Sequence, residues 1–486
     1  MSSEDTLDTR NDNDGQVPAV ESRPALVVLH ASEPALIGTV LPLLKRGESR
    51  VIGRGDRDAA DRHPRALPIA QRPGKNDAAG CFSDPYLSRE QLLVTAISED
   101  CIRIENVGKR DLLDGAGRVV SSIDLSIGES AEVKGRLLLL ATMRPATLPA
   151  ARSLGKKHHP FGDADAHGFV GESALAWKLR DSAAFVAART PHVLLLGESG
   201  TGKEVVAQAV HELSARKSKR IVSRNAATLP AGLIDAELFG HVANYPNVGM
   251  PERPGLVAEA DGSTLFLDEI GELSHELSTR LLRVLDDRGE YQRLGDPKPR
   301  TSSFRLIGAT NRSVASLKGD VAARFRLRLS VPTLNERRED IPLIARYLLR
   351  RAALRDAEIG ERFLEGWNGK TGEPRLSIDL VRALVAHEYR THVRELDLLL
   401  WASLASSPGE VAELTPEVAH ELEPSVGVAP DASAPRIDTR ALTADDVRAA
   451  IERAGGVHEK AWRDLGLVNR HVLKRLVKKF GLREDD

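Results

Sequence analysis

A glycine-rich segment, Gly197-Glu-Ser-Gly-Thr-Gly-Lys203-Glu204, has the residue types and spacing needed to hold the phosphates of a nucleotide. It follows the apolar run 192–196 and precedes a helical pattern from Val205 to Ala215, which is the strand, loop and helix order of a P-loop. Glycines let backbone N–H groups turn toward phosphates, the helix N-terminus adds positive potential, and Lys203 can reach the terminal phosphates. The segment predicts a nucleotide site made by Gly197, Glu198, Ser199, Gly200, Thr201, Gly202, Lys203 and Glu204.

A second segment, Thr264-Leu-Phe-Leu-Asp268-Glu269, is an apolar run that predicts a strand ending in two carboxylates. In a P-loop ATPase the first acid holds magnesium, directly or through water, and the second polarises the attacking water. Glu204 stands where many P-loops place the Ser or Thr that binds magnesium, so Asp268 is expected to hold Mg²⁺ with other groups. The run 304–309 ends at Asn311, whose amide could sense the terminal phosphate. An ordinary glycine turn is the alternative for the first segment.

These segments resemble the AAA+ domain of bacterial enhancer-binding proteins, which activate sigma-54 RNA polymerase. The resemblance runs from about Phe169 to about Ser406. It rests on ordered matches, which are GESGTGKE at 197–204, AELFGH at 236–241, ADGSTLFLDEIGEL at 260–273, GATNR at 308–312, ERREDI at 336–341 and VREL at 393–396.

The resemblance implies that the chain binds and hydrolyses ATP. It implies that Asn225 restrains Glu269 until the nucleotide is sensed, that Arg324 is a finger reaching the neighbouring subunit's nucleotide, and that Arg394 is the sensor of a helical lid. Both arginines could instead be plain surface residues. A finger acting in trans implies a homo-oligomeric ring, because each site is then completed by the next subunit. The implied catalytic set is Asp268, Glu269, Asn225, Asn311, Arg324 and Arg394.

Three departures from the family pattern affect the functional prediction. The family touches sigma-54 through a loop reading GAFTGA, and residues 244–249 here read Asn-Tyr-Pro-Asn-Val-Gly. Pro246 fixes its own φ and removes a donor, which argues against ordinary sigma-54 engagement. Lys318 replaces a first finger arginine and loses the planar fork, and Tyr389-Arg-Thr-His392 replaces a Trp-Pro-Gly-Asn turn. Together they predict slow ATP turnover or a changed client.

The composition predicts several ordinary domains. The chain has 486 residues, of which 41% are apolar and 28% charged. Its net charge of −2 gives no overall attraction to DNA or membranes. Cys81 and Cys101 are too few for a disulfide framework and suit a reducing cytoplasm, where we expect them to be buried small apolar residues. The sequence predicts neither a signal peptide nor a membrane span, and therefore no membrane partner.

Short β-rich runs between turn residues predict an all-β sandwich over 25–145. Its loops supply arginines and a hydroxyl, which suit a phosphate dianion. They resemble the forkhead-associated (FHA) domain, a phosphothreonine reader. Gln91 replaces a usual histidine and the loop before Ser88 is long, so an FHA-shaped domain that binds no phosphopeptide is the alternative. The implied phosphopeptide site is Arg54, Ser88, Arg89, Lys109 and Arg110.

The last residues of the chain predict a small helical domain with a glycine turn at Gly466. Between Lys460 and Phe480 there are seven Lys or Arg residues and one Asp, a locally basic segment. It resembles the Fis-type helix-turn-helix, in which a second helix enters the major groove of DNA. A solvated basic face is the alternative. The candidates for DNA contacts are Asn469, Arg470, His471, Lys474, Arg475, Lys478 and Lys479.

The predicted fold class is therefore multi-domain, with an all-β FHA-like sandwich, an α/β AAA+ P-loop ATPase with a helical lid, and an all-α helix-turn-helix. Residues 146–167 contain several His and Asp residues without rigid spacing, which favours a plain linker over a metal site. The expected boundaries are a disordered tail 1–24, the sandwich 25–145, the linker 146–167, the ATPase subdomain 168–338, the lid 339–422, a linker 423–440 and the helix-turn-helix 441–486.

The whole pattern predicts a cytoplasmic bacterial transcription regulator that binds upstream promoter or enhancer DNA, uses ATP and Mg²⁺, and receives a signal through a phosphothreonine protein. Two alternatives remain because of the altered loop at 244–249. One is an ATP-switched, DNA-bound scaffold that does not remodel sigma-54. The other is a AAA+ remodeller of a different client.

Overall fold

A computed structural model describes residues 22–41, 45–56, 63–155, 159–228, 233–273, 289–314, 319–422 and 443–453, together with positions 281, 284, 285, 461, 462, 465, 473 and 477. The chain divides into two compact units, Met1–Leu422 and Glu423–Asp486. Among the described residues, no helix is long and apolar enough to cross a membrane.

The N-terminal part consists of two antiparallel sheets. One has the strand order β5-β4-β2-β1-β12-β11-β8-β9 and the other β10-β7-β6-β3. The first strand already begins at Ser22, inside the stretch expected to be a tail. The bounds are β1 Ser22–His30, β2 Val40–Leu41, β3 Ser49–Ile52, β4 Ile69–Arg72, β5 Lys75–Ala78, β6 Leu92–Ser98, β7 Cys101–Asn106, β8 Leu112–Leu113, β9 Val119–Val120, β10 Ser122–Ser126, β11 Ser130–Val133 and β12 Leu137–Pro145, with a 3-10 turn Pro34–Leu36.

Strand β1 is buried on both faces, which is unusual for a sandwich strand. Alternate side chains of a strand point to opposite faces. Leu26 and Val28 pack in the core between the two sheets. Val27 and Leu29 pack instead in a second core that they share with the helices of residues 341–400. The outer face of this sheet is therefore not a solvent face.

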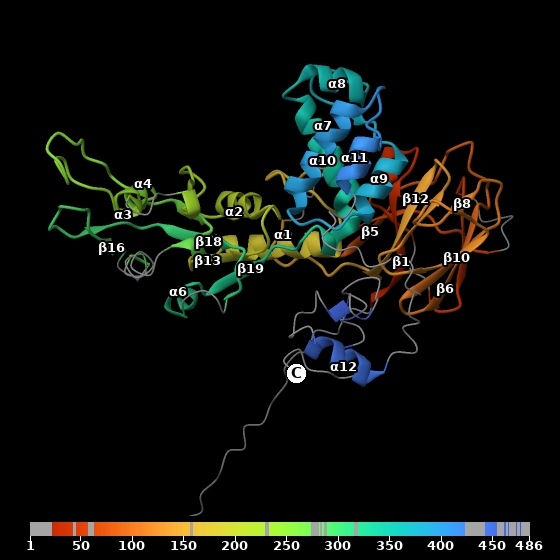
Figure 1. Cartoon of the computed structure of the whole chain (residues 1–486), viewed down its shortest axis with the longest axis horizontal. Coiled ribbons are helices and arrows are strands. Elements are labelled where there is room, and N and C mark those ends of the chain that lie inside the picture. The colour runs from red at the N-terminus through yellow and green to blue at the C-terminus, as the bar shows by residue number, and fades with distance from the viewer. Residues whose placement is uncertain are drawn as a thin grey trace, which may run out of the picture. The chain divides into compact units, whose positions relative to one another are not determined.

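The α/β part is built on a parallel sheet with the order β14-β15-β18-β13-β19. Its apolar strands are covered on both faces, as parallel sheets require. Leu194 and Leu265 pack on one side, and Val193 and Ile307 on the other. Figure 1 shows α1 and α2 beside β13 and β18. The bounds are α1 Ala174–Ala187, β13 Val193–Leu196, α2 Lys203–Glu212, β14 Val222–Asn225, α3 Ile234–Phe239, α4 Leu256–Glu259, β15 Thr264–Asp268, β16 Glu290–Tyr291, β17 Arg300–Thr301, β18 Arg305–Thr310, α6 Gly319–Arg324 and β19 Leu327–Ser330, with 3-10 turns Ala226–Thr228 and Ile270–Glu272.

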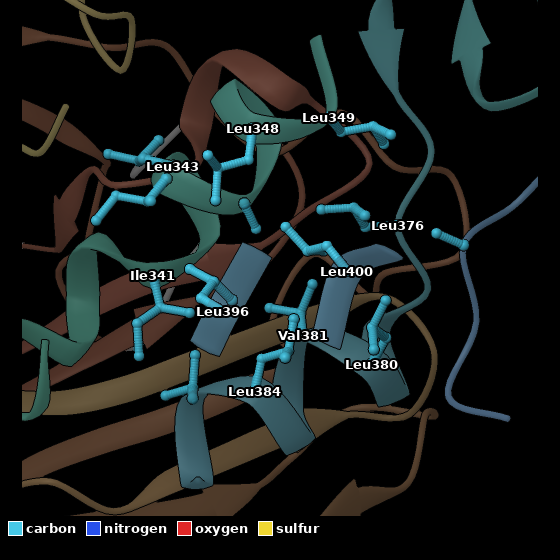
Figure 2. Packing of buried hydrophobic residues seen from close by; sticks show 14 of the residues in the cluster. Ile341, Leu343, Leu348, Leu349, Leu376, Leu380, Val381, Leu384, Leu396 and Leu400 are labelled. Carbon is cyan, nitrogen blue, oxygen red and sulfur yellow. The ribbon is translucent and has the colours of Figure 1, made fainter. Parts of the chain in front are cut away.

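A helical subdomain follows the sheet. In Figure 2 the labelled side chains of α7, α9 and α10 point toward one another and form its core. Ser377 begins α9 by accepting a hydrogen bond from the N–H of Leu380 at 3.2 Å, a helix cap. The bounds are a 3-10 turn Asn335–Asp340, α7 Ile341–Ala353, α8 Ala357–Phe363, β20 Leu364–Glu365, β21 Glu373–Pro374, α9 Ile378–Ala386, α10 His392–Ser406 and α11 Pro416–Leu422.

Polar contacts join the sandwich to this helical subdomain. The buried Glu132 of β11 forms an ion pair with Arg382 of α9. Arg346 of α7 donates to the carbonyl of Pro34 at 3.1 Å. The fully buried Arg144 of β12 lies 3.3 Å from Glu339. Because the apolar core is also shared, the sandwich and the lid are packed as one body.

The segment 146–167 does more than connect domains. Asp165 pairs with Arg180 at 2.9 Å, and His167 lies 2.5 Å from the Glu212 carboxylate. Together with α1 and α2 the segment lines a mostly apolar cavity of about 340 Å³. Within the described ranges, no three His, Cys, Asp or Glu side chains are grouped to hold a metal ion. The described residues 146–155 and 159–167 therefore make specific contacts with the ATPase part, and the assignment of this segment as a linker stays a prediction.

The second unit contains α12, Ala444–Arg453. Thr443 caps it, because its hydroxyl oxygen accepts from the N–H of Asp446 at 3.3 Å and its own N–H donates to the Asp446 carboxylate at 2.9 Å. Val447 and Ile451 pack with Leu473 and Val477 in a small core. All seven predicted DNA-contact residues, from Asn469 to Lys479, lie outside the described residues.

Both cysteines are free and half-buried, not buried as expected. Burial and the nearby Asp124 carboxylate raise the pKa of the Cys101 thiol.

The junction between sandwich and lid should respond to acid. Burial, reinforced by the Arg346 guanidinium, lowers the pKa of His30 to about 4. In the unfolded chain the pKa of this histidine returns to its ordinary value of about 6.5. Between about pH 6.5 and about pH 4 the unfolded chain therefore binds more protons than the folded one, so the free energy of unfolding decreases as the pH falls through this range. The loss is at most about 3 kcal/mol. We expect His30→Asn to reduce this dependence in urea titrations at about pH 7.5 and about pH 5. Equal pH dependence of both chains would contradict the assignment.

Candidate nucleotide-binding site

The glycine-rich loop joins the end of β13 to the start of α2. Gly200 and Gly202 have φ values of 80° and 98°, a left-handed conformation that glycine adopts without strain. Lys203 is buried, and its Nζ donates to the carbonyls of Gly197 and Glu198 at 3.0 and 3.1 Å. The Thr201 hydroxyl donates to the Glu198 carbonyl at 2.9 Å. The loop therefore folds around its own lysine.

The strand order brings the other predicted residues to the same edge of the sheet. Leu196 pairs with Thr310, and the N–H of Gly197 donates to the Thr310 carbonyl at 3.2 Å, so Asn311 follows directly beside the loop. Asn225 pairs with Asp268 at the ends of β14 and β15. All these strands are parallel, so their carboxyl ends meet at one edge, where ligands of open α/β sheets bind.

The two acids differ in backbone conformation. Glu269 has φ 51°, which is uncommon for a residue with a side chain. Asp268 Oδ1 accepts from the N–H of Glu269 at 3.0 Å, which fixes the turn between them. Asn225 Oδ1 accepts from the N–H of Ala227 at 2.8 Å. The proposed restraint of Glu269 by Asn225 stays a prediction.

The two predicted arginines are both exposed. Arg324 is the last residue of α6, and Arg394 lies in the first turn of α10. Arg394 Nη1 lies 3.4 Å from the Ser199 hydroxyl, so this arginine is already beside the loop. Lys318 lies outside the described residues.

The residues present fit a nucleoside triphosphate. The loop provides left-handed glycines, a helix N-terminus and a buried ammonium group, the features that bind phosphate. Asp268 is half-buried at the strand end and can provide one carboxylate ligand to Mg²⁺. Glu204 is exposed in the first turn of α2 and adds no hydroxyl ligand.

The loop at 244–249 is short and closed on itself. The N–H of Asn244 donates to the Met250 carbonyl at 2.9 Å, and the N–H of Gly249 donates to Asn244 Oδ1 at 2.8 Å. Asn244 has φ 63°, which asparagine tolerates better than most residues. Val248 is 95% exposed at the tip. Pro246 and Asn247 stand where the family pattern has an aromatic and a hydroxyl, and the exposed aliphatic Val248 follows them.

The loops of the sandwich bring the predicted phosphate ligands together. The N–H of Arg54 donates to the Ser88 carbonyl at 3.0 Å, and the Ser88 hydroxyl accepts from the N–H of Lys109 at 3.1 Å. Gln91 is fully buried and bridges these loops. Its Nε2 donates to the Arg110 carbonyl at 2.9 Å, and its Oε1 accepts from the N–H of Ser88 at 3.2 Å.

Two contacts in these sites were not predicted from the sequence. His392 reaches the loop glutamate Glu198 at 3.0 Å, and an exposed Tyr86 lies under the guanidinium of Arg136 at 4.2 Å. The first joins residues far apart in the chain, so no local pattern could indicate it. The only sequence signal at His392 was its departure from the family turn.

The parallel sheet, the phosphate loop and the helical lid define a P-loop domain of the AAA+ ATPase type. Residues 169–334 match the family model of the sigma-54 interaction domain. The chain is 34% identical over 335 residues to the transcriptional regulatory protein ZraR of Salmonella typhimurium, covering 65% of this chain and 70% of that one. It is 36% identical over 323 residues to the Nif-specific regulatory protein of Azotobacter vinelandii, covering 63% and 58%.

A solved structure of NtrX from Brucella abortus in complex with ATP is 27% identical and covers 64% of this chain and 69% of that one, with a TM-score of 0.44. The chain belongs to the family of sigma-54-dependent transcriptional regulators.

The bridge made by Gln91 can be tested by substitution. Gln91→Ala removes partners from partly buried backbone groups of two loops, which should cost about 2 kcal/mol. Hydrogen exchange measured at increasing urea concentrations should show that peptides covering 85–110 lose protection at a lower urea concentration in this variant than in the intact chain. Asn76→Ala, whose exposed amide makes a single bond to the Ala146 carbonyl at 3.0 Å, is the matched control and should change stability by about 0.5 kcal/mol or less. Unchanged opening in Gln91→Ala would show that the bridge is not needed.

Proposed function

We propose that the chain is an ATP-dependent transcription regulator that hydrolyses ATP within a ring and remodels a client on DNA. The observation that carries this proposal is the meeting of Lys203, Asp268 and Asn311 at one edge of the parallel sheet. Membership of the sigma-54-dependent family supports it.

In the proposed mechanism, Lys203 exchanges its two carbonyl partners for phosphate oxygens of ATP, while the N–H groups at the start of α2 donate to the same phosphates. Asp268 would hold a magnesium ion, which neutralises charge on the phosphates. Glu269 accepts a proton from the attacking water and orients it. Asn311 contacts the terminal phosphate from the neighbouring strand and Arg394 from the lid. These two contacts couple the phosphate state to the lid.

The exposed position of Arg324 supports a ring. Arg324 is the exposed last residue of α6, and we propose that it contacts the nucleotide of a neighbouring subunit. It then stabilises the charge that develops on the transferred phosphoryl group.

The C-terminal unit is proposed to bind upstream DNA through a Fis-type helix-turn-helix. The proposal rests on the basic residues between Lys460 and Phe480 and on the core made around α12. The N-terminal sandwich is proposed to bind a phosphothreonine protein. The gathering of Arg54, Ser88 and Lys109 at adjoining loops supports this.

A second candidate function is favoured by the loop at 244–249. Its closed hydrogen bonding and exposed Val248 differ from the family pattern, so the chain would act on a client other than sigma-54 or serve as a DNA-bound scaffold.

The ring can be tested by mixing two inactive variants. Glu269→Gln keeps the finger and Arg324→Ala keeps the general base, and each alone should lose about 100-fold or more of ATP turnover. An equimolar mixture should recover about a quarter of the wild-type rate, because random assembly pairs an intact Glu269 with an intact Arg324 in that fraction of sites. Arg326→Ala, an exposed arginine nearby, should stay within about two-fold of wild type. A mixture no more active than its components would contradict a finger in trans.

The client can be tested by grafting a loop. Replacing residues 244–249 with Gly-Ala-Phe-Thr-Gly-Ala should raise ATP-dependent open-complex formation by sigma-54 polymerase at least about 10-fold, if the native loop fails to engage it. Steady-state ATP turnover should change little, because the loop contributes no residue to the nucleotide edge. Open complexes formed equally well by the native chain would rule out the second candidate function.

Phosphothreonine binding can be tested at Arg54. A fluorescent phosphothreonine peptide library should bind the intact chain, and Arg54→Ala should weaken the best peptide at least about 10-fold. Arg103→Ala is the matched control, because this exposed arginine pairs with Asp124 on the sheet face at 2.7 Å. Equal affinity of Arg54→Ala and the intact chain for the peptide would contradict the assignment of the sandwich as a phosphothreonine-binding domain.

A further inference from the structure

The lid and the phosphate loop touch through consecutive residues on each side. His392 Nε2 lies 3.0 Å from Glu198 Oε2. The N–H of Val393 donates to the Gly200 carbonyl at 3.1 Å, and Arg394 Nη1 lies 3.4 Å from the Ser199 hydroxyl. Three consecutive residues at the start of α10 therefore contact three consecutive residues of the loop.

The packing between these two segments leaves no room for a side chain at Gly200. A Cβ atom at Gly200 would lie 2.0 Å from the carbonyl oxygen of Thr391. Lid backbone thus rests directly on loop backbone. A change in the shape of the loop must move the start of α10.

His392 is built into this contact under strain. It has φ 50°, a left-handed conformation that costs a residue with a side chain about 1 kcal/mol or more. Its imidazole is fully buried, and its Nδ1 atom has no hydrogen-bond partner among the described residues. Among the described residues, the ring therefore makes one polar contact, the one to Glu198.

Glu198 connects the ring to the phosphate site. Its carbonyl accepts from Lys203 Nζ at 3.1 Å and from the Thr201 hydroxyl at 2.9 Å, while its carboxylate contacts His392. When Lys203 turns to phosphate oxygens, the Glu198 peptide loses a charged donor. Glu198 thus contacts both the phosphate-binding lysine, through its carbonyl, and the lid, through its carboxylate.

We propose that His392 is a positioning residue, and that its contact with Glu198 sets Arg394 against the terminal phosphate of bound ATP. The proposal rests on the function proposed above. Arg394 lies two residues after His392 in the same helical turn, so the contact fixes both the height and the rotation of α10 over the loop. ADP lacks the terminal phosphate, so the contact should matter for ATP and not for ADP.

The test measures affinity for ATPγS and ADP by competition with a fluorescent ADP on the full chain. His392→Asn relaxes the left-handed strain, but the asparagine side chain is too short for its amide to reach the position of Nε2. His392→Gln keeps a hydrogen-bond donor near that position. We expect His392→Asn to reduce the preference for ATPγS over ADP at least about 5-fold, with the ADP affinity within about two-fold of wild type. His392→Gln should restore most of the preference.

Two further variants separate this role from general support of the fold. Glu198→Ala, which removes the acceptor, should reproduce the effect of His392→Asn, and the double variant should lose no more than either single one. His387→Asn is the matched control, because His387 pairs with Glu395 inside the lid at 2.8 Å. Equal weakening of ATPγS and ADP, additive losses, or an unchanged preference in His392→Asn would overturn the proposal.

A failure of the proposed function gives a different result. If the intact chain binds neither nucleotide, ATP-dependent function is wrong, and the contact is then tested by hydrogen exchange without nucleotide. Peptides covering 197–203 should exchange faster in His392→Asn than in the intact chain. Equal exchange in the two chains would overturn the contact itself.

Discussion

The hold of the phosphate loop on the Lys203 ammonium group is the interaction on which the rest of the site depends. Two loop carbonyls satisfy a buried positive charge, which would otherwise be costly. Phosphate oxygens are stronger partners for the same charge. The loop is therefore prepared to exchange its own carbonyls for a ligand. The parallel strand order places Asp268 and Asn311 at the same edge of the sheet, so one bound nucleotide can contact residues from several strands.

A second consequence concerns the lid. Its helices share a hydrophobic core with the outer face of the N-terminal sandwich through Val27 and Leu29, and α10 rests on the phosphate loop. The lid thus touches both the sandwich and the nucleotide edge. Because close-packed cores deform little, a shift at one of these contacts would have to displace whole helices. Buried charges at the junction, such as Glu132 with Arg382, oppose separation of the sandwich from the lid because each would be left unpaired.

The sequence allowed the strands and the loop to be predicted because their signals are local. Apolar runs at 193–196 and 264–267 end in glycines or acids, and parallel strands then bring them together. The His392 contact could not be predicted, since 194 residues separate it from Glu198. The core shared by the sandwich and the lid could not be predicted for a similar reason. The apolar pattern around Val27 predicts a strand but does not indicate which element covers its outer face. Gln91, interpreted as a departure that weakens the sandwich site, proves to bridge its loops through hydrogen bonds from its own buried side chain.

Calorimetric titration of ATPγS with Mg²⁺ into the intact chain and into Lys203→Ala tests most directly whether the loop is a phosphate site. Binding of about one nucleotide per chain, weakened at least about 100-fold by the substitution, is the predicted result. Absence of binding to the intact chain, or equal binding by Lys203→Ala, would contradict the assignment of the loop.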